Sequence, residues 1–335
     1  MDTNLKREVE IPKTEVIDQS FDWLYFTGAL RAALELRLWE KVAAGLNTPG
    51  KLADKEGWDK KGAQVLLDVI CHIKLLSKDG EQYALVPESE MYLMPDKPTY
   101  KGEMLLNEFH WEADGKLAES IRTGKRPVSY DVTKPNVTQL WMADYSSSWV
   151  YPESMAEIDD HLWDSLEVKA REGLRVLDLA CGPAPRSLSL ARRHPGVRLT
   201  WLDWKDILKT AMKVAGELGV SRQVTVLTGD LWQVALDQES FDLAFLGNLT
   251  HFFSPEDNIR LFQKVFAALA PSGLIVVRSV ARPESSLGVS ADLWLYAASA
   301  GGGAYGFKDY QAMLEKAGFT DITDIEQVPI RARKP

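Results

Sequence analysis

Residues 176–195 read VLDLACGPAPRSLSLARRHP, which predicts a strand ending at Asp178, a turn of small residues and then a helix. The N-terminus of such a helix presents free backbone N–H groups and a partial positive charge, which suit a carboxylate ligand. Small residues at Ala180, Gly182 and Ala184 let a ligand approach the backbone. The spacing departs from the G-x-G-x-x-G pattern of dinucleotide enzymes, so the turn argues against a pyrophosphate ligand.

The chain from Gly173 onward alternates short apolar runs with helical stretches. The runs lack regular polar alternation, which is typical of strands buried on both faces of a parallel sheet. This rhythm predicts a doubly wound α/β fold, whose ligands bind at the carboxyl ends of the strands. The runs are LRVLDLA, VRLTWLD, VTVLTGD, FDLAFLG and GLIVVRS.

Acidic residues follow the second and third predicted strands. Asp203 stands at a place suited to ribose hydroxyls, although it could instead cap the helix that follows. Asp230 could accept a hydrogen bond from an exocyclic amine, with Leu231 and Trp232 on either side of a purine ring. The alternative for this segment is a strand-end turn with a buried Trp.

The segment LGNLTHFF, residues 246–253, places His251 just past the fourth predicted strand. A lone His is more often structural than catalytic, but a position at the mouth of the sheet favours a general base. Arg278 ends the fifth predicted strand and could pair with a substrate carboxylate or face solvent.

The first part of the chain predicts a helix from Ile17 to about Ala44, a short helix in TPGKLADKEGW and a longer one in KKGAQVLLDVICHIKLL. A hairpin is expected around Asp79-Gly80. The order helix, helix and hairpin indicates a winged helix, which serves either DNA binding or dimerisation. The formal net charge of −9 argues against nucleic acid as a partner.

Residues 96–165 are rich in aromatic side chains and are broken by Pro127 and Pro135, so we expect several helices joined by a loop. Aromatic residues in helices are mostly core. A connection between domains is also where small-molecule clefts form, so this segment is a candidate wall of a substrate pocket.

The two cysteines, Cys71 and Cys181, suggest no disulfide framework and therefore a reducing compartment. The first twenty residues lack an apolar signal core, and no run approaches the length of a membrane span. We therefore expect a soluble, cytoplasmic protein with no membrane partner. The five histidines show no ligand spacing, so no metal is expected.

Together these features resemble the two-domain small-molecule O-methyltransferases that use S-adenosyl-L-methionine (SAM), including plant phenolic, hydroxyneurosporene and bacteriochlorophyllide enzymes. The resemblance covers about residues 17–335 and rests on the winged-helix order followed by VLDLACG, LDW, GDLW, NLTHFFSPEDN and AYGFKDYQAMLEKAGF. It implies SAM as cofactor, S-adenosyl-L-homocysteine (SAH) as product, and a homodimer without DNA binding. The implied domains are a winged-helix dimerisation domain at 1–95, a helical bridge to the substrate pocket at 96–165 and a SAM-binding methyltransferase domain at 166–335.

The resemblance also implies site residues. Those expected at the cofactor are Asp178, Ala180, Gly182, Ala184, Asp203, Trp204, Asp230, Leu231, Trp232 and Asn248. Those expected at the substrate are Phe109, Trp111, Trp149, Arg278, Trp294 and Tyr305. Two turn positions at which the family has glycine carry alanine here. A further alternative is therefore a protein that binds SAM without transferring its methyl group.

His251 matches the catalytic base of the family, in a His-Phe-Phe segment where the plant enzymes have H-D-W. The acids that orient this base in the plant enzymes fall at Ser279 and Ala304, and neither is acidic. A base without its orienting carboxylate loses tautomer control and imidazolium stabilisation. We therefore expect methyl transfer to a hydroxyl with His251 as base, and leave open an S- or C-methyltransferase that works by positioning. A winged-helix regulator with a SAM-like sensor domain is a further alternative.

Overall fold

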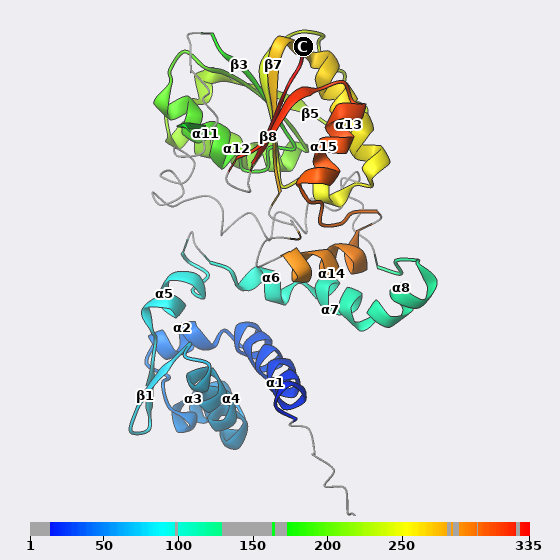
Figure 1. The fold of residues 1–335 in the computed structure, drawn as a ribbon. Coiled ribbons are helices and arrows are strands. Elements are labelled where there is room, and N and C mark those ends of the chain that lie inside the picture. The colour runs from blue at the N-terminus through cyan, green and yellow to red at the C-terminus, as the bar shows by residue number, and fades with distance from the viewer. Residues whose placement is uncertain are drawn as a thin grey trace, which may run out of the picture. The chain divides into compact units, whose positions relative to one another are not determined.

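A computed structural model describes residues 14–97, 100–128, 163–164, 173–279, 283, 288–299, 301–325 and 329–335. The chain divides into two compact units, Met1–Gly102 and Glu103–Pro335 (Figure 1). Helices just after Gly102 belong to the second unit, and most of the predicted bridge at 96–165 lies outside the described residues. None of the described helices is long and apolar enough to cross a bilayer.

The first unit contains the predicted order of helix, helix and hairpin. Thr48 and Asp59 cap the two helices by accepting hydrogen bonds from Lys51 N and Gly62 N. The strands pair antiparallel around Gly80. The elements are α1 (Glu15–Glu35), α2 (Leu38–Ala43), α3 (Pro49–Glu56), α4 (Lys60–His72), β1 (Ser77–Asp79), β2 (Gln82–Ala84) and α5 (Pro87–Tyr92).

Two helix predictions in this unit are corrected. The single helix expected from Ile17 to about Ala44 is broken, because Arg37 has a left-handed backbone with φ +55° and separates α1 from α2. The longer helix in KKGAQVLLDVICHIKLL ends at His72, four residues earlier than its apolar pattern suggests. Lys74, just beyond, also has a positive φ.

The first half of α1 exposes a large apolar surface. Residues 14–25 are all exposed, and the apolar side chains among them have exposed fractions between 55% and 72%. These side chains are Val16, Ile17, Phe21, Trp23, Leu24 and Tyr25. Only the last turns of the helix contribute buried residues, Ala33 and Leu34.

The second unit is built on a seven-stranded sheet in the order β5-β4-β3-β6-β7-β9-β8. The five predicted strands are parallel, which confirms the doubly wound α/β fold. Two antiparallel strands complete the sheet and were not predicted. The strands are β3 (Arg175–Leu179), β4 (Arg198–Asp203), β5 (Val224–Thr228), β6 (Phe241–Gly247), β7 (Leu269–Arg278), β8 (Thr320–Asp324) and β9 (Ile330–Arg333).

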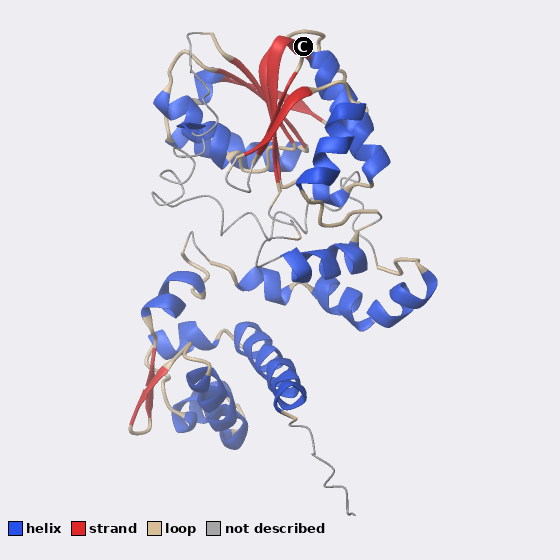
Figure 2. Ribbon diagram, in the orientation of Figure 1, coloured by secondary structure: helices blue, strands red, loops and turns tan. Residues whose placement is uncertain are grey.

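Helices cover both faces of this sheet (Figure 2). α11 (Pro185–Arg193) and α12 (Lys205–Glu217) pack on one face, and α13 (Pro255–Ala268) and α15 (Phe307–Lys316) pack on the other. The remaining elements are α6 (Gly102–Leu106), α7 (Glu108–Gly115), α8 (Leu117–Thr123), α14 (Gly288–Ala298) and the 3-10 turns η2 (Ser221–Gln223) and η3 (Thr250–Phe252).

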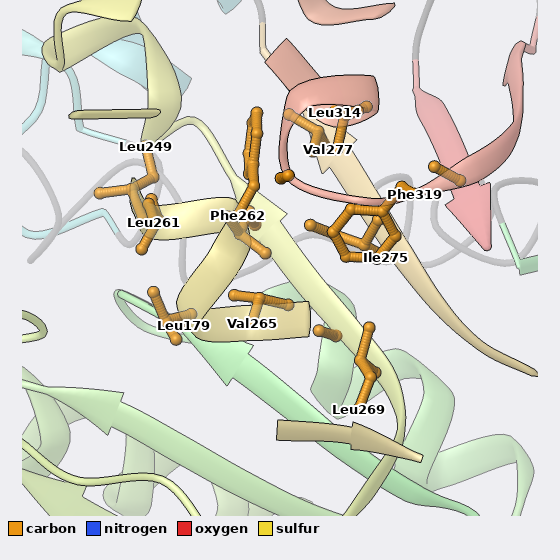
Figure 3. Packing of buried hydrophobic residues seen from close by; sticks show 14 of the residues in the cluster. Leu179, Leu249, Leu261, Phe262, Val265, Leu269, Ile275, Val277, Leu314 and Phe319 are labelled. Carbon is orange, nitrogen blue, oxygen red and sulfur yellow. The ribbon is translucent and has the colours of Figure 1, made fainter. Parts of the chain in front are cut away.

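The core on the α13 face joins that helix to the sheet. Phe262 of α13 is fully buried and lies close to Ile275 and Val277 of β7, with Leu314 of α15 nearby (Figure 3). Truncating such a Phe to Ala typically costs about 3–5 kcal/mol. This packing fixes the carboxyl ends of β6 and β7, where the candidate site begins.

Candidate active site

The small-residue turn after β3 has an alternating left-handed backbone. Ala180, Gly182 and Ala184 have φ values of +54°, +58° and +56°. These are the three positions at which the resemblance implies glycine, and the conformation explains that preference. Alanine accepts this conformation at a cost of about 1–2 kcal/mol per residue. The turn leads directly into α11, whose first N–H groups have no partner within the helix.

Asp178 lies beneath this turn and is buried. Its Oδ2 accepts a hydrogen bond from Ser187 Oγ at 2.5 Å, and Ser187 Oγ accepts one from Trp201 Nε1 at 3.0 Å. Burial raises the pKa of Asp178 to about 7. Through these contacts Asp178 ties β3 to α11 and β4, while its contact with a cofactor stays a prediction.

Asp203 ends β4 beside the same turn, as its spacing predicts. One oxygen accepts from Gly182 N at 2.9 Å and the other from Trp204 N at 2.7 Å. Burial raises the pKa of Asp203 to about 6, and these two backbone hydrogen bonds oppose the rise. A carboxylate accepts about four hydrogen bonds, so Asp203 keeps capacity for two hydroxyl donors.

The turn after β5 joins the same site. Gly229 N donates to Asp203 O at 3.1 Å, which brings the third strand end beside the second. Asp230 Oδ1 accepts from Trp232 N at 2.8 Å, and Leu231 is buried. Lys264 Nζ donates to Leu231 O and to Val234 O, at 2.5 and 2.6 Å. Lys264, on α13, thus holds the turn that follows β5. The sequence did not predict this role, because a lysine in an amphipathic helix usually faces solvent.

Trp232 connects this turn to the segment that carries His251. Its ring meets Phe253 edge-on, with centroids 5.3 Å apart. The Arg260 guanidinium lies 4.9 Å from the centroid of the Trp232 ring. The predicted purine-binding turn and the predicted base are therefore neighbours.

His251 lies in η3 and is buried, with 5% of its surface exposed. Its Nδ1 lies 2.9 Å from Ser279 Oγ, at the end of β7. The position that carries an orienting acid in the plant enzymes therefore does contact the histidine, but as a neutral hydroxyl. Burial lowers the pKa of His251 to about 4, so the ring is neutral at physiological pH.

Backbone hydrogen bonds fix the segment around His251. Asn258 Nδ2 donates to Thr250 O at 2.9 Å and to Phe253 O at 3.3 Å. Gly303 N donates to His251 O at 3.0 Å. A side chain at the preceding Gly302 would place its Cβ 2.1 Å from His251 O, so glycine is required there. Asn258 is a positioning residue that sequence reasoning missed.

Tyr305 and Arg278 were predicted at the substrate, and the structure gives each a structural contact. Tyr305 OH donates to Phe253 O at 2.7 Å and so helps to hold the His251 segment. The carbonyl of Arg278 accepts from Asn248 N at 2.6 Å, and Asn248 has φ +54°. Substrate contacts of Tyr305 and Arg278 stay predictions.

The other predicted substrate residues meet at α7 and α14. Trp294 of α14 donates from Nε1 to His110 Nδ1 at 2.9 Å. Phe109 and Trp294 pack against the same small cluster around Ala113 and Ala297. Trp111, on α7, donates from Nε1 to Leu105 O at 2.8 Å. Trp149 lies outside the described residues. Within the described part of the chain, no group of three or more His, Cys, Asp or Glu side chains is arranged to hold a metal ion.

Comparisons with known proteins agree on the class of this fold. Residues 176–273 match the family described as "Methyltransferase domain". The chain is 25% identical over 309 residues to the tetracenomycin polyketide synthesis 8-O-methyl transferase TcmO of Streptomyces glaucescens, with 89% of each chain covered. It is 26% identical over 324 residues to the L-tyrosine C(3)-methyltransferase of Streptomyces lavendulae, covering 90% of this chain and 86% of that protein.

A solved structure has the same fold over almost the whole length. Human N-acetylserotonin methyltransferase, in complex with SAM, matches with a TM-score of 0.70 at 20% identity. The match covers 98% of this chain and 99% of that chain. The fold therefore extends beyond the residues of the family match and includes both units of the chain.

Proposed function

We propose that this chain, which is a SAM-dependent methyltransferase, transfers the methyl group to an aromatic hydroxyl of a small molecule, with His251 as the base. The observation that carries the proposal is the placement of His251. It is buried past the end of β6, its Nδ1 contacts Ser279, and its segment is held from α13 by Asn258. Its Nε2 is then the nitrogen that would receive the proton of an acceptor.

The residues at the strand ends fit the cofactor. The partial positive charge at the N-terminus of α11 suits the carboxylate of the cofactor, and the spare acceptor capacity of Asp203 suits a ribose diol. Asp230 suits the exocyclic amine of a purine, with Leu231 and Trp232 beside the ring. When bound, SAM supplies an electrophilic methyl group on a sulfonium sulfur.

The proposed role of the protein is to place the acceptor oxygen in line with that methyl group. The oxygen–carbon bond forms as the carbon–sulfur bond breaks, the electron pair stays on sulfur, and the phenolic proton passes to His251 Nε2. Holding two reactants at near-attack distance can supply much of the barrier reduction. The hydrogen bonds that fix residues 250–253 serve this positioning.

Methyl transfer to carbon or sulfur is the second candidate. It is favoured by the neutral Ser279 contact and by the low pKa of His251, because both weaken the ring as a base. One relative, which is 26% identical to this chain, is named as a methyltransferase that acts on a carbon atom, the L-tyrosine C(3)-methyltransferase. A thioether or an already enolised carbon acceptor has no proton to lose in the transfer, so it would need positioning and no base.

The test combines cofactor binding with product analysis. We expect SAM and SAH to bind in calorimetry, and labelled SAM to yield methyl ethers from a panel of phenols but no product from thiols or carbon acids. Ser279→Asp, which supplies the family's carboxylate, should raise turnover of weakly acidic phenols, with Ser279→Ala as its matched control. Exclusive C- or S-methyl products would contradict the proposed acceptor. Failure of both SAM and SAH to bind would contradict the proposal that this chain is a SAM-dependent methyltransferase.

We also propose that α1 dimerises with a second copy of the chain. The apolar side chains in the first half of α1 are exposed, and a short isolated helix is marginal in water. Its exposed Ile17 and Leu24 would be covered by the same surface of the partner. Ile17→Asp and Leu24→Asp together should shift the molecular mass measured by light scattering to that of a monomer. Val289→Asp, at an exposed position of α14, is the control and should leave the mass unchanged.

We infer a reducing, cytoplasmic location. Cys71 is partly exposed and Cys181 is buried, and both are free thiols. Disulfides are rare where glutathione and thioredoxin keep thiols reduced. Fractionation of the producing cells would test this inference, and recovery in a secreted fraction would contradict it.

A further inference from the structure

The turn that follows β5 lies at an edge of the sheet. β5 is the outermost strand on its side, and among the described strands it pairs with β4. Residues 229–234 continue from β5 as a turn, and residues 230–232 within it are the ones proposed for the adenine of SAM. The start of the turn is anchored by Gly229 N, which donates to Asp203 O at 3.1 Å. The described part of the sheet therefore supports this turn from the β4 side alone.

Lys264 of α13 supplies the support that the sheet does not. Its Nζ donates to Leu231 O at 2.5 Å and to Val234 O at 2.6 Å. A lysine ammonium is a compact charge with three donors on a flexible stem, so a single group can bind two carbonyl oxygens at once. One side chain thus holds both ends of the segment from Leu231 to Val234.

The backbone of the turn is folded around Asp230. The amides of Gln233 and Val234 both donate to Asp230 O at 2.9 Å, and Trp232 N donates to Asp230 Oδ1 at 2.8 Å. These contacts fix the carboxylate relative to the turn. A carboxylate accepts about four hydrogen bonds, so Asp230 keeps capacity for an exocyclic amine. The place at which Lys264 holds the turn therefore decides where this carboxylate lies.

α13 also holds the aromatic part of the turn. Arg260 lies one helical turn before Lys264, and its guanidinium lies 4.9 Å from the centroid of the Trp232 ring. Burial lowers the pKa of Lys264, and the negative charge of Asp230 opposes this shift. The ammonium and the carboxylate therefore interact electrostatically within the turn. The contacts from α13 reach the turn from outside the sheet, opposite in origin to the anchor at Gly229.

We propose that Lys264 is a positioning residue that gives the cofactor site its preference for a 6-aminopurine. It acts through Asp230, whose carboxylate accepts from the exocyclic amine. The inference rests on the proposed function and adds to it a residue that controls recognition of the cofactor base. A hydrogen bond weakens steeply as its geometry departs from the optimum, so a shifted turn loses the amine contact first. The contacts proposed at Asp203 and α11 belong to other strand ends and would stay.

The test compares SAH with its 6-deamino analogue, in which a hydrogen atom replaces the exocyclic amine. The dissociation constants of both are measured by calorimetry on the full chain, so no acceptor and no turnover is involved. Lys264→Met keeps an unbranched stem and removes the ammonium, and Lys264→Gln keeps an amide donor without the charge. Lys209→Met makes the same change at an exposed lysine of α12, which pairs with Asp206, and is the matched control.

We expect the wild type and Lys209→Met to prefer SAH by about tenfold to hundredfold, the value of a hydrogen bond to a charged group. Lys264→Met should lower this preference to about twofold, because most of the amine contact is lost, and Lys264→Gln should lie between. A merely structural role would weaken both ligands equally, so a full preference in Lys264→Met would overturn the inference. Equal binding of the two ligands by the wild type would also overturn it. If Lys264→Met binds neither ligand, Lys264→Gln decides by the same ratio.

The proposed function is scored separately on the same preparations, by labelled methyl transfer from SAM to phenols. A chain that shows the expected loss of preference but forms no methyl ether refutes the proposed function alone. A chain that forms methyl ethers but keeps its full preference in Lys264→Met refutes the inference alone.

Discussion

The cofactor side and the acceptor side of the second unit are assembled in different ways. On the cofactor side, each part follows its own strand within a few residues, and backbone groups join the parts, as Gly182 N and Gly229 N do at Asp203. The acceptor side joins side chains from distant segments. Trp294 and His110, which share a hydrogen bond, are 184 residues apart in the chain.

The two sides also respond to protons in opposite ways. Burial raises the pKa of Asp203 to about 6, above the ordinary carboxyl value of 3.8. The stability that Asp203 contributes is therefore present below about pH 4 and is lost as pH rises through 6. Burial lowers the pKa of His251 from 6.5 to about 4, so its contribution is present above 6.5 and is lost as pH falls through 4. Burial thus gives opposite pH dependences to the acid on the cofactor side and the histidine on the acceptor side.

The largest expected contrast between the two sides comes from His251→Ala. We expect turnover of a phenol to fall by about 10²–10⁴-fold, because proton transfer by a positioned side chain contributes that much. SAH affinity, measured by calorimetry, should stay within about twofold, since His251 is on the acceptor side. His72→Ala, at an exposed histidine of α4, is the matched control. Nearly full turnover in His251→Ala would show that positioning alone is sufficient.

The opposed pH dependence is the next largest effect. The free energy of unfolding is measured with urea by circular dichroism at pH 4 and pH 7.5. Between pH 7.5 and pH 4 the wild type should lose about 3 kcal/mol of this free energy because of His251, and His251→Gln should not show this loss. Between pH 4 and pH 7.5 the wild type should lose a similar amount of unfolding free energy because of Asp203, and Asp203→Asn should not show this loss. If both variants shifted in the same direction, the electrostatic contrast between the two sides would be wrong.

A smaller effect is expected from Asp203→Asn on the cofactor itself. The amide keeps one acceptor oxygen but loses the charge, so SAH affinity should fall by about tenfold to hundredfold in calorimetry. Asp206→Asn provides the control, because this exposed acid lies three residues on and pairs only with Lys209 among the interactions described for it. Unchanged affinity in Asp203→Asn would remove Asp203 from the cofactor site.

The smallest effect concerns the alanines of the turn. Ala184→Gly should stabilise the second unit by about 0.5–1 kcal/mol, because relief of the left-handed strain exceeds the extra entropy of the unfolded chain. Ala211→Gly makes the same chemical change within α12 and should destabilise by about 1 kcal/mol or more. The two midpoints of urea unfolding should therefore move in opposite directions. A loss of stability in Ala184→Gly would mean that the alanine side chain packs usefully in the turn.

The cofactor side was largely predictable from the sequence because its geometry is local. The run from Asp178 to Ala184 specified a strand, a turn and a helix, and the positive φ values fall at the predicted small residues. The five parallel strands were predictable because each is an apolar run. β8 was not, because TDITD is mostly polar and partly exposed, and its place in the sheet comes from pairing with β9.

The acceptor side was less predictable because its contacts depend on tertiary packing. The sequence placed His251 and Ser279 as a matched pair only through the family resemblance, and the structure brings them to 2.9 Å. Asn258 and His110 gave no signal, since an amide in a helix and a histidine among aromatics are common in any core. Trp149, which was predicted to contact the substrate, lies in residues 129–162, outside the residues that the structure describes.

The position of β9 affects the order in which the protein can be completed during synthesis. β9 is the last strand in chain order, yet it lies between β7 and β8 and pairs with both. Until the ribosome has released Ile330–Arg333, β7 keeps an unpaired edge and β8 has no neighbour in the sheet. A nascent chain that already contains every predicted cofactor residue therefore still carries an open strand edge on β7 until β9 has emerged, and such an edge is prone to aggregation.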